Sequence, residues 1–275
     1  MATLPELKKK LKSIKSTEKL TKAMKSVSAA KYSALANLFS AYSHYSTECN
    51  ALYRKHENEI NACFPAADKN APPAVFVFSS NKGMCGGFNT EIFSFLTEKM
   101  NELPENTLYF PCGKKAVSFF SDKGIPFEKS FIFSDVPESS EGEKFLSELL
   151  SMREKGEISL AYAVFPKYKN VMRQTPVMSE LFTTENSMKE DGESAPLFVP
   201  DKKTVMESIA GKVIFTAVYS VILETALGAQ ASTLTTMRSA HDTATAYSSQ
   251  LEIQINRKRQ SEVTADVIET AHTEE

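Results

Sequence analysis

A glycine-rich segment is the first stretch of this sequence whose residue types could do chemistry. Residues 79–89 read Ser-Ser-Asn-Lys-Gly-Met-Cys-Gly-Gly-Phe-Asn and lie between a β-prone run and a predicted helix, where phosphate-binding loops sit. However, Lys82 precedes the glycines, and neither the Gly-Lys-Ser/Thr order of a P-loop nor the Gly-x-Gly-x-x-Gly spacing is present. The segment therefore favours a structural strand-to-helix turn, and nucleotide binding is the less favoured alternative.

Nucleophilic or metal chemistry finds little support elsewhere in the sequence. Cys85 could be a nucleophile at a helix N-terminus, but a Cys–His pair requires a histidine in the same domain. All the histidines lie on long predicted helices: His44, His56, His241 and His272. The cysteines show no metal-binding spacing: Cys49, Cys63, Cys85 and Cys112. We therefore expect no catalytic residues, no metal site and no bound cofactor, and we expect reduced thiols.

Two clusters of basic residues are the strongest functional signal. Residues 1–31 hold nine lysines and two glutamates, an excess of seven positive charges, and residues 256–260 read Asn-Arg-Lys-Arg-Gln. The net charge of the whole chain is −2, which argues against a general nucleic-acid binder, and the aromatic and glycine interleaving of single-strand binders is absent. The clusters predict an acidic protein partner; the alternative is a solvated, lysine-rich helix face.

Two long predicted helices carry these clusters. Residues 6–64 contain neither Gly nor Pro, and residues 201–275 contain no Pro and only two glycines. Apolar or small residues recur at steps of three and four, which indicates narrow helical stripes. The predicted inward residues of the first helix are Leu7, Leu11, Ile14, Leu20, Met24, Val27, Ala34, Leu38, Tyr45 and Leu52. Those of the second are Phe215, Tyr219, Ile222, Ala226, Ala229, Thr233, Met237, Ala240, Ala244, Tyr247, Leu251 and Ile255. Because a thin stripe stabilises a lone helix poorly, we expect the two helices to pair as an antiparallel coiled coil.

The middle of the chain follows a different pattern. After a proline-containing linker, short apolar strands alternate with helices, which predicts βαβ units and a largely parallel sheet. The predicted strands are residues 74–78, 108–111, 130–133, 160–165 and 175–182, and the predicted helices are residues 89–101, 114–122 and 141–155. The predicted organisation is an N-terminal coiled-coil helix (1–64), the linker (65–73), a globular domain (74–200) and a C-terminal coiled-coil helix (201–275). The predicted fold class mixes α/β and α+β: a long antiparallel two-helix coiled coil with a Rossmann-like α/β domain inserted between its helices.

The C-terminal helix also contains the longest apolar run. Residues 213–227 are interrupted by Thr216, Ser220, Glu224 and Thr225, so we expect no membrane-spanning helix. Asp201 is the predicted N-cap of this helix.

Five segments, in chain order, carry a family resemblance. The most specific are residues 20–31 (Leu-Thr-Lys-Ala-Met-Lys-Ser-Val-Ser-Ala-Ala-Lys), residues 80–89, and residues 256–260 followed by a Val-Thr pair at 263–264. Residues 113–120 and the hairpin region at 168–176 agree with the same family. Together they resemble the gamma subunit of the rotary (F-type) ATP synthase, whose loop reads Ser-Asp-Arg/Lys-Gly-Leu-Cys-Gly-x-x-Asn.

The resemblance implies a non-catalytic rotor in the central stalk of a proton-translocating ATP synthase. This rotor transmits torque from the membrane ring of c subunits to the catalytic beta subunits during ATP synthesis or hydrolysis. The implied partners are the alpha and beta subunits of the catalytic hexamer, the small stalk subunits (delta and epsilon) and the c ring, with one copy of this chain per complex and no nucleic acid.

The resemblance also implies which residues contact the beta subunit. They are Lys22, Met24, Lys25, Asn256, Arg257, Arg259 and Gln260. Met24 and Lys25 would lie near the acidic lever loop of beta, and Arg259 and Gln260 near its catch loop. The family signature loop, with a structural role, contains Lys82, Gly83, Cys85, Gly86 and Asn89.

Two departures from the family pattern lie in the C-terminal helix. Where the family has a Glu four residues before an Arg-Met pair, this chain has Ala229, Thr233 and Leu234. The loss is self-consistent, because both members of an i,i+4 ion pair worth only about 0.2–0.5 kcal/mol are absent together. The chain also ends Thr273-Glu274-Glu275, in place of the apolar Gly-Ala-rich tail usual in the family.

The sequence leaves more than one interpretation open for the cellular compartment and for the class of function. The compact length favours a mitochondrial protein, peripheral on the matrix side of the inner membrane, and the alternative is the cytoplasmic side of a bacterial plasma membrane. The alternative function is a nucleotide-binding α/β enzyme with coiled-coil oligomerisation arms. A third, less favoured interpretation is a coiled-coil scaffold with no moving partner.

Overall fold

The computed structural model describes residues 3–63, 70–181, 199 and 201–273. In chain order its elements are α1 (Leu4–Lys55), α2 (Glu57–Asn61), β1 (Ala74–Phe78), α3 (Phe88–Met100), β2 (Leu108–Cys112), α4 (Lys114–Lys123), α5 (Ser139–Glu154), β3 (Ala161–Asn170), β4 (Arg173–Glu180) and α6 (Lys202–Thr273). The chain divides into two compact units. We call Met1–Ala29 with Thr233–Glu275 the coil unit, and Ala30–Ser232 the sheet unit.

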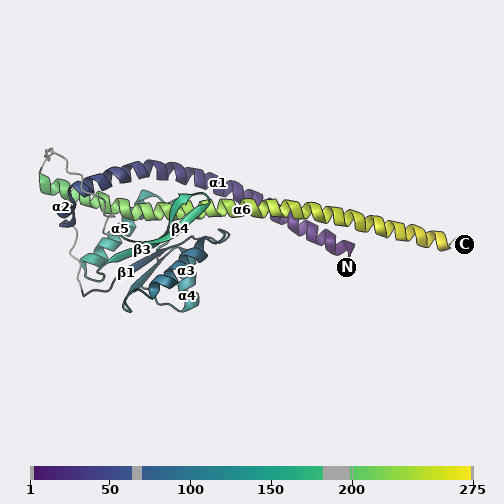
Figure 1. The fold of residues 1–275 in the computed structure, drawn as a ribbon, viewed down its shortest axis with the longest axis horizontal. Coiled ribbons are helices and arrows are strands. Elements are labelled where there is room, and N and C mark those ends of the chain that lie inside the picture. The colour runs from purple at the N-terminus through teal and green to yellow at the C-terminus, as the bar shows by residue number, and fades with distance from the viewer. Residues whose placement is uncertain (1–2, 64–69, 182–198, 200, 274–275) are drawn as a thin grey trace. The chain divides into compact units, whose positions relative to one another are not determined.

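The sheet unit is built on a four-stranded sheet in the order β2-β1-β3-β4. Figure 1 labels three of these strands, β1, β3 and β4. β1 pairs in parallel with both β2 and β3, as the alternation of strands and helices predicts. β4 pairs antiparallel with β3, because the two residues between them can form a hairpin but not a crossover. The predicted strand at residues 130–133 is wrong: Phe131 forms only an isolated parallel bridge with Cys112. The Phe131 N–H donates to the Pro111 carbonyl and the Glu128 N–H to the Tyr109 carbonyl, so this part of the chain touches the edge of β2 without forming a ladder.

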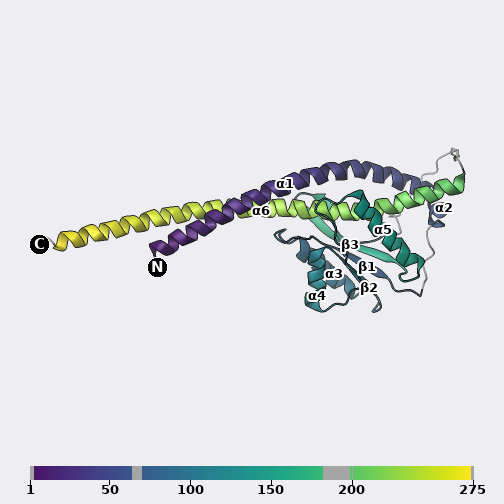
Figure 2. The same cartoon turned by 180° about the vertical axis from the view of Figure 1, so that it is seen from behind.

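Helices cover both faces of this sheet (Figure 2), with α3 and α4 on one face and α5 and α6 on the other. On one face, Phe76 of β1 packs in a buried cluster with Phe145 of α5 and Val218 of α6. On the other face, Val75 packs with Ile92 of α3. All five residues of β1 are buried, which confirms the prediction of a strand covered on both faces.

One side of the apolar half of α6 belongs to this core, where Ile214, Val218 and Ile222 are at most 2% exposed. Val213 and Leu227 are equally buried but pack in clusters with residues of α1. A window within Lys202–Ala265 is long and apolar enough to cross a membrane by composition, but half of it is buried in the structure, and a buried core helix gives the same signature. The predicted N-cap is confirmed: the Thr204 backbone N–H donates to Asp201 Oδ1 at 3.0 Å.

The inward face of α1 differs from the predicted one. Five predicted inward residues are 37–57% exposed: Leu20, Val27, Leu38, Tyr45 and Leu52. Positions shifted along the helix are buried in their place: Thr21, Ser28, Leu35, Cys49 and Tyr53. In α6, Tyr247 is 43% exposed and its neighbour Ser248 is buried. The spacing of three and four was therefore correct, but from Leu20 onward the phase of the α1 stripe was wrong by about one residue, or 100° around the helix. Leu7, Leu11 and Ile14 are half-buried as predicted, and every predicted inward residue of α6 except Tyr247 is buried or half-buried.

Small polar side chains that bond the backbone of their own helix account for this phase. The buried Thr21 hydroxyl donates to the backbone carbonyls of Thr17 and Glu18, both at 3.0 Å, so a polar side chain can be buried without an unpaired group. The buried Ser248 hydroxyl likewise donates to the Thr245 carbonyl at 3.0 Å. Small, self-satisfied side chains let backbones come close, whereas Leu20 would hold them apart.

Candidate functional site

Polar contacts set the antiparallel register of the coil unit. Lys15 Nζ lies 2.6 Å from Glu252 Oε1, and the Thr245 hydroxyl donates to Glu18 Oε1 at 3.1 Å. Residues 15 and 18 of α1 therefore lie opposite residues 252 and 245 of α6. Extended in the same register, this pairing brings residues 256–260 level with the first turns of α1. The two basic clusters predicted from the sequence therefore lie toward the same end of the coil unit.

The predicted beta-contacting side chains are accessible on the coil unit. Lys22, Asn256, Arg257, Arg259 and Gln260 are exposed, and Met24 and Lys25 are half-buried. Within the described residues, no carboxylate lies within ion-pair distance of the four cations Lys22, Lys25, Arg257 and Arg259, whereas Lys15 is paired with Glu252. These four charges are therefore available to groups outside the chain. That they contact a beta subunit stays a prediction.

The signature loop between β1 and α3 is closed by its own side chains. Asn89 Oδ1 accepts from the Ser80 backbone N–H at 3.1 Å, and Asn89 Nδ2 donates to Ser80 Oγ at 2.8 Å and to Cys85 Sγ at 3.1 Å. The Ser80 hydroxyl donates to the Lys82 carbonyl at 2.6 Å. Cys85 is 3% exposed, and its carbonyl accepts from the Ser232 hydroxyl of α6 at 2.6 Å. The Ser80 and Asn89 side chains are thus committed to holding the turn.

Two left-handed residues shape this turn. Gly86 has φ +57° and Met84 has φ +64°. Gly86 adopts that conformation without strain, whereas a side chain there costs free energy. Met84 is also 56% exposed. The bend lets Asn89, at the start of α3, reach back to Ser80 at the end of β1.

Lys82 of the same loop takes part in a cluster that the sequence did not reveal. Asp135 Oδ2 accepts from Lys82 Nζ at 2.7 Å and from Lys31 Nζ of α1 at 2.5 Å. Burial alone would raise the pKa of the Asp135 carboxyl, but the hydrogen bonds from Lys31 and then Lys82 outweigh it and hold this pKa below its usual range. One carboxylate therefore joins α1 to the signature loop.

Asp135 lies in a segment, residues 133–137, that we call the strap. The Phe133 carbonyl accepts from Asn81 Nδ2 at 2.6 Å, and the Pro137 carbonyl accepts from the Tyr219 hydroxyl of α6 at 2.9 Å. The strap thus receives contacts from α1, α6 and the signature loop. Without regular secondary structure or a motif of its own, it left no signal in the sequence.

A second half-buried carboxylate fixes the β3–β4 hairpin. The Tyr168 backbone N–H donates to Glu224 Oε2 of α6 at 2.8 Å, next to a register irregularity between Tyr168 and Asn170. Burial raises the pKa of Glu224, and the Tyr168 hydrogen bond offsets part of that rise. The sequence showed Glu224 only as an interruption of an apolar run.

The departures from the family pattern fall in two different places. Ala229 is 8% exposed and belongs to the cluster on the α3 face of the sheet, where a carboxylate would be buried among apolar side chains. Glu274 and Glu275 lie outside the described residues. No group of three or more His, Cys, Asp or Glu side chains suited to a metal ion occurs in the described part of the chain.

Comparison with known proteins agrees with the predicted resemblance. A family model described as ATP synthase matches residues 3–272. The chain is 27% identical over 281 residues to the ATP synthase gamma chain of Rubrobacter xylanophilus, covering 98% of this chain and 97% of the relative. It is 25% identical to the gamma chain of Polynucleobacter asymbioticus, with the same two shares covered.

Solved structures share the fold. A chain of the Euglena gracilis mitochondrial ATP synthase (OSCP/F1/c-ring) has a TM-score of 0.68 at 15% identity, covering 98% of this chain and 93% of that chain. A chain of the Tetrahymena thermophila mitochondrial ATP synthase (central stalk/c-ring) has a TM-score of 0.60 at 17% identity, covering 80% and 99%. Because the family model spans nearly the whole sequence, this chain belongs to the ATP synthase family, and the relatives it resembles there are the gamma chains.

Proposed function

We propose that this chain is the rotor subunit of the central stalk of an ATP synthase. The observation that carries the proposal is the slender coil unit, whose exposed cations Lys22, Arg257 and Arg259 have no carboxylate partner within the described residues. Membership of the ATP synthase family supports it, as does the fold shared with a chain of the Euglena gracilis rotor, at a TM-score of 0.60.

The proposed mechanism is coupling through differential contacts. The coil unit rotates inside the hexamer of alpha and beta subunits, and its cations meet acidic groups of each beta subunit in turn. A contact that is stronger in one beta conformation than in another shifts that subunit toward the favoured nucleotide affinity. The chain itself performs no bond chemistry. The internal commitment of Ser80, Cys85 and Asn89 supports this non-catalytic role.

The proposed partners follow from that role. They are the alpha and beta subunits, the small stalk subunits (delta and epsilon) and the c ring, with one copy of this chain in each complex. The signature loop (Lys82, Gly83, Cys85, Gly86 and Asn89) is proposed as a structural turn and not as a ligand site. We propose a peripheral location on the inner mitochondrial membrane, matrix side, and the bacterial plasma membrane is the alternative because the similar gamma chains are bacterial.

The direct test replaces Arg259 and Gln260 by Ala in the assembled complex. ATP hydrolysis should fall several-fold with assembly intact, because an exposed ionic contact contributes up to about 1 kcal/mol. Lys123→Ala, an exposed lysine on α4, is the matched control and should leave turnover unchanged. Equal turnover in both variants would remove the proposed contact from the mechanism.

The alternative function, a nucleotide-binding enzyme with oligomerisation arms, has its own test. Equilibrium dialysis of the isolated chain against ATP and NAD should detect no tight binding, and the isolated chain should not hydrolyse ATP. Tight binding of either nucleotide, or turnover by the chain alone, would favour the enzyme over the rotor.

A further inference from the structure

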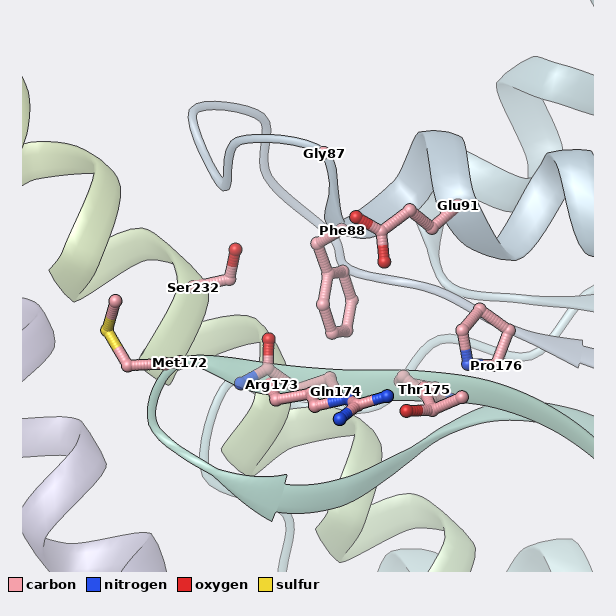
Figure 3. A pocket seen from close by; sticks show the side chains of 10 residues that line it. Gly87, Phe88, Glu91, Met172, Arg173, Gln174, Thr175, Pro176 and Ser232 are labelled. Carbon is pink, nitrogen blue, oxygen red and sulfur yellow. The ribbon is translucent and has the colours of Figure 1, made fainter.

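A pocket of about 360 Å³ lies beneath the tip of the β3–β4 hairpin (Figure 3). Its walls come from the start of α3, from the hairpin and from Ser232 of α6. The Phe88 ring points from α3 toward the hairpin, with the Glu91 carboxylate on the α3 side and the Arg173 guanidinium on the hairpin side (Figure 3). None of these residues belongs to the coil unit or to the predicted beta-contacting set.

The walls of this pocket are held in place by contacts within the sheet unit. Gly228 lets α6 approach both walls: a Cβ at this position would lie 3.1 Å from Phe88 Cε2 and 3.2 Å from Gln174 Cγ. The hairpin is pinned by the Tyr168 N–H bond to Glu224. A pocket that is already formed loses less conformational entropy when a partner binds.

The tip of the hairpin carries an unbalanced charge. Lys167, Lys169 and Arg173 are exposed, and Glu91 is the acidic side chain across the pocket. Among the described residues, no carboxylate lies within 4.0 Å of any of these three cations, and Glu91 has no ion-pair partner either. The charge of Lys167 also acts on the Glu224 carboxylate, without an ion pair, so three cations face two carboxylates, and the excess positive charge favours an anionic partner.

An apolar side chain stands at the same tip. Met172 is 79% exposed and lines the pocket together with the neighbouring Arg173. A flexible thioether adapts to differently shaped apolar surfaces, which is why methionine is frequent at binding surfaces. The tip therefore offers both charge and apolar contact to one partner.

We propose that the hairpin tip and its pocket form a docking surface for an acidic segment of a protein partner. A carboxylate of that segment pairs with Arg173 or Lys169, and an apolar side chain beside it enters the pocket between the Phe88 ring and Met172. The inference rests on the proposed function only in that the partner is sought among the subunits of the assembled ATP synthase.

The shape of the surface favours a protein over an anionic lipid headgroup. The pocket needs a protruding apolar side chain to fill it, and a flat, uniformly anionic surface would bring like charge against Glu91. A protein segment can place its carboxylates over the hairpin and avoid Glu91.

The test places a photoreactive benzoylphenylalanine at position 172 of the full chain in the purified, membrane-embedded complex. The expected product is one cross-link to a peptide rich in Asp and Glu, identified by mass spectrometry. The charge-reversal pair Lys169→Glu with Arg173→Glu should lower its yield about ten-fold, as expected for loss of electrostatic complementarity, and Glu91→Lys should raise it. The matched controls are benzoylphenylalanine at Ile132, which is 48% exposed, and the charge-reversal pair Lys123→Glu with Lys144→Glu.

Several outcomes would overturn the proposal. They are no cross-link from position 172, a cross-link to lipid, a cross-link to a neutral or basic peptide, and a cross-link yield that does not change on charge reversal. If the double charge reversal prevents assembly, two measurements still test the proposal: the cross-link yield of Glu91→Lys, and the yield of the unreversed chain at increasing salt concentration. The yield should fall with salt, because an electrostatic contact weakens as ionic strength rises. The Arg259 and Gln260 variants report on the rotor function separately, so failure of one proposal is distinguishable from failure of the other.

Discussion

Replacement of Asp135 by Asn should detach two lysines from the strap. The carboxylate accepts from Lys31 at 2.5 Å and from Lys82 at 2.7 Å. Asn keeps the shape and one acceptor oxygen but removes the charge that both lysines share. The change therefore isolates the electrostatic part of the contact between α1 and the signature loop.

The expected loss follows from how exposed each partner is. The side chains of Lys31 and Asp135 are 30% and 21% exposed, so this charged hydrogen bond should contribute about 1.5–3 kcal/mol. The Lys82 side chain is 72% exposed, so its contribution should be about 0–1 kcal/mol after solvent screening. Because Asn retains part of the bonding, we expect Asp135→Asn to lower the free energy of unfolding by about 1–3 kcal/mol.

Urea unfolding of the full chain, followed by circular dichroism, measures this loss. Asp122→Asn on α4, an exposed acid without an ion pair in the described residues, is the matched control and should change stability by less than about 0.5 kcal/mol. A double-mutant cycle with Lys31→Ala should show a coupling of about 1 kcal/mol or more. The reasoning is refuted if Asp135→Asn matches Asp122→Asn, or if the Lys31 and Asp135 substitutions are additive.

The contribution of Asp135 should also depend on pH. Its pKa is lower in the folded chain than in the unfolded chain, so the unfolded chain takes up the proton first as the pH falls. The stabilisation should be complete above the unfolded pKa of about 3.9 and lost as the pH falls through the folded value. In Asp135→Asn this part of the acid dependence should be absent.

Five further substitutions test other parts of the structure by thermal or urea unfolding. Burial raises the pKa of Glu224 in the folded chain, so ionisation of this carboxyl opposes folding as the pH rises above about 4.3. Glu224→Gln should therefore raise the melting temperature at pH 7–8 and change it little at pH 4. A lower melting temperature at neutral pH would contradict this. Gly142→Ala would place a Cβ 2.7 Å from a buried tyrosine ring and should cost about 1–3 kcal/mol. Gly211→Ala, where the Cβ meets nothing within 4 Å, should stabilise the chain by about 0.5–1 kcal/mol. If Gly211→Ala destabilised the chain more than Gly142→Ala, the packing described for these two glycines would be wrong. Leu35→Ala, at a fully buried position, should cost about 2–5 kcal/mol. Leu38→Ala, at a position that is 37% exposed, should cost clearly less. Equal losses of stability in the Leu35 and Leu38 variants would favour the inward face of α1 that the sequence predicted.

The elements whose environment is set locally could be predicted from the sequence. The apolar run of β1 indicates burial on both faces, and Asp201 marks the start of α6 because its side chain bonds the backbone three residues later. The basic clusters were found from composition alone, and the register of the coil unit places them toward the same end. Each of these signals lies within a few neighbouring residues.

Features that depend on distant residues could not be predicted. A spacing of three and four fixes a helical stripe but not which of two adjacent stripes faces inward, so Leu20 was preferred over Thr21. Residues 130–133 have strand-like composition but meet the edge of β2 at one position only. Asp135 acquires its role from lysines 104 and 53 residues away in the chain, a separation at which no local pattern exists.

The side chains buried between the two helices of the coil unit are mostly small or polar. They include Thr21, Ser28, Ala244 and Ser248, with larger apolar side chains at Met237 and Leu251. Little apolar area therefore stabilises the pairing of these helices when the chain is alone. Their amides should open with a lower free energy than those of β1 and of the apolar half of α6. The coil unit of the isolated chain is therefore expected to be less rigid than the sheet unit.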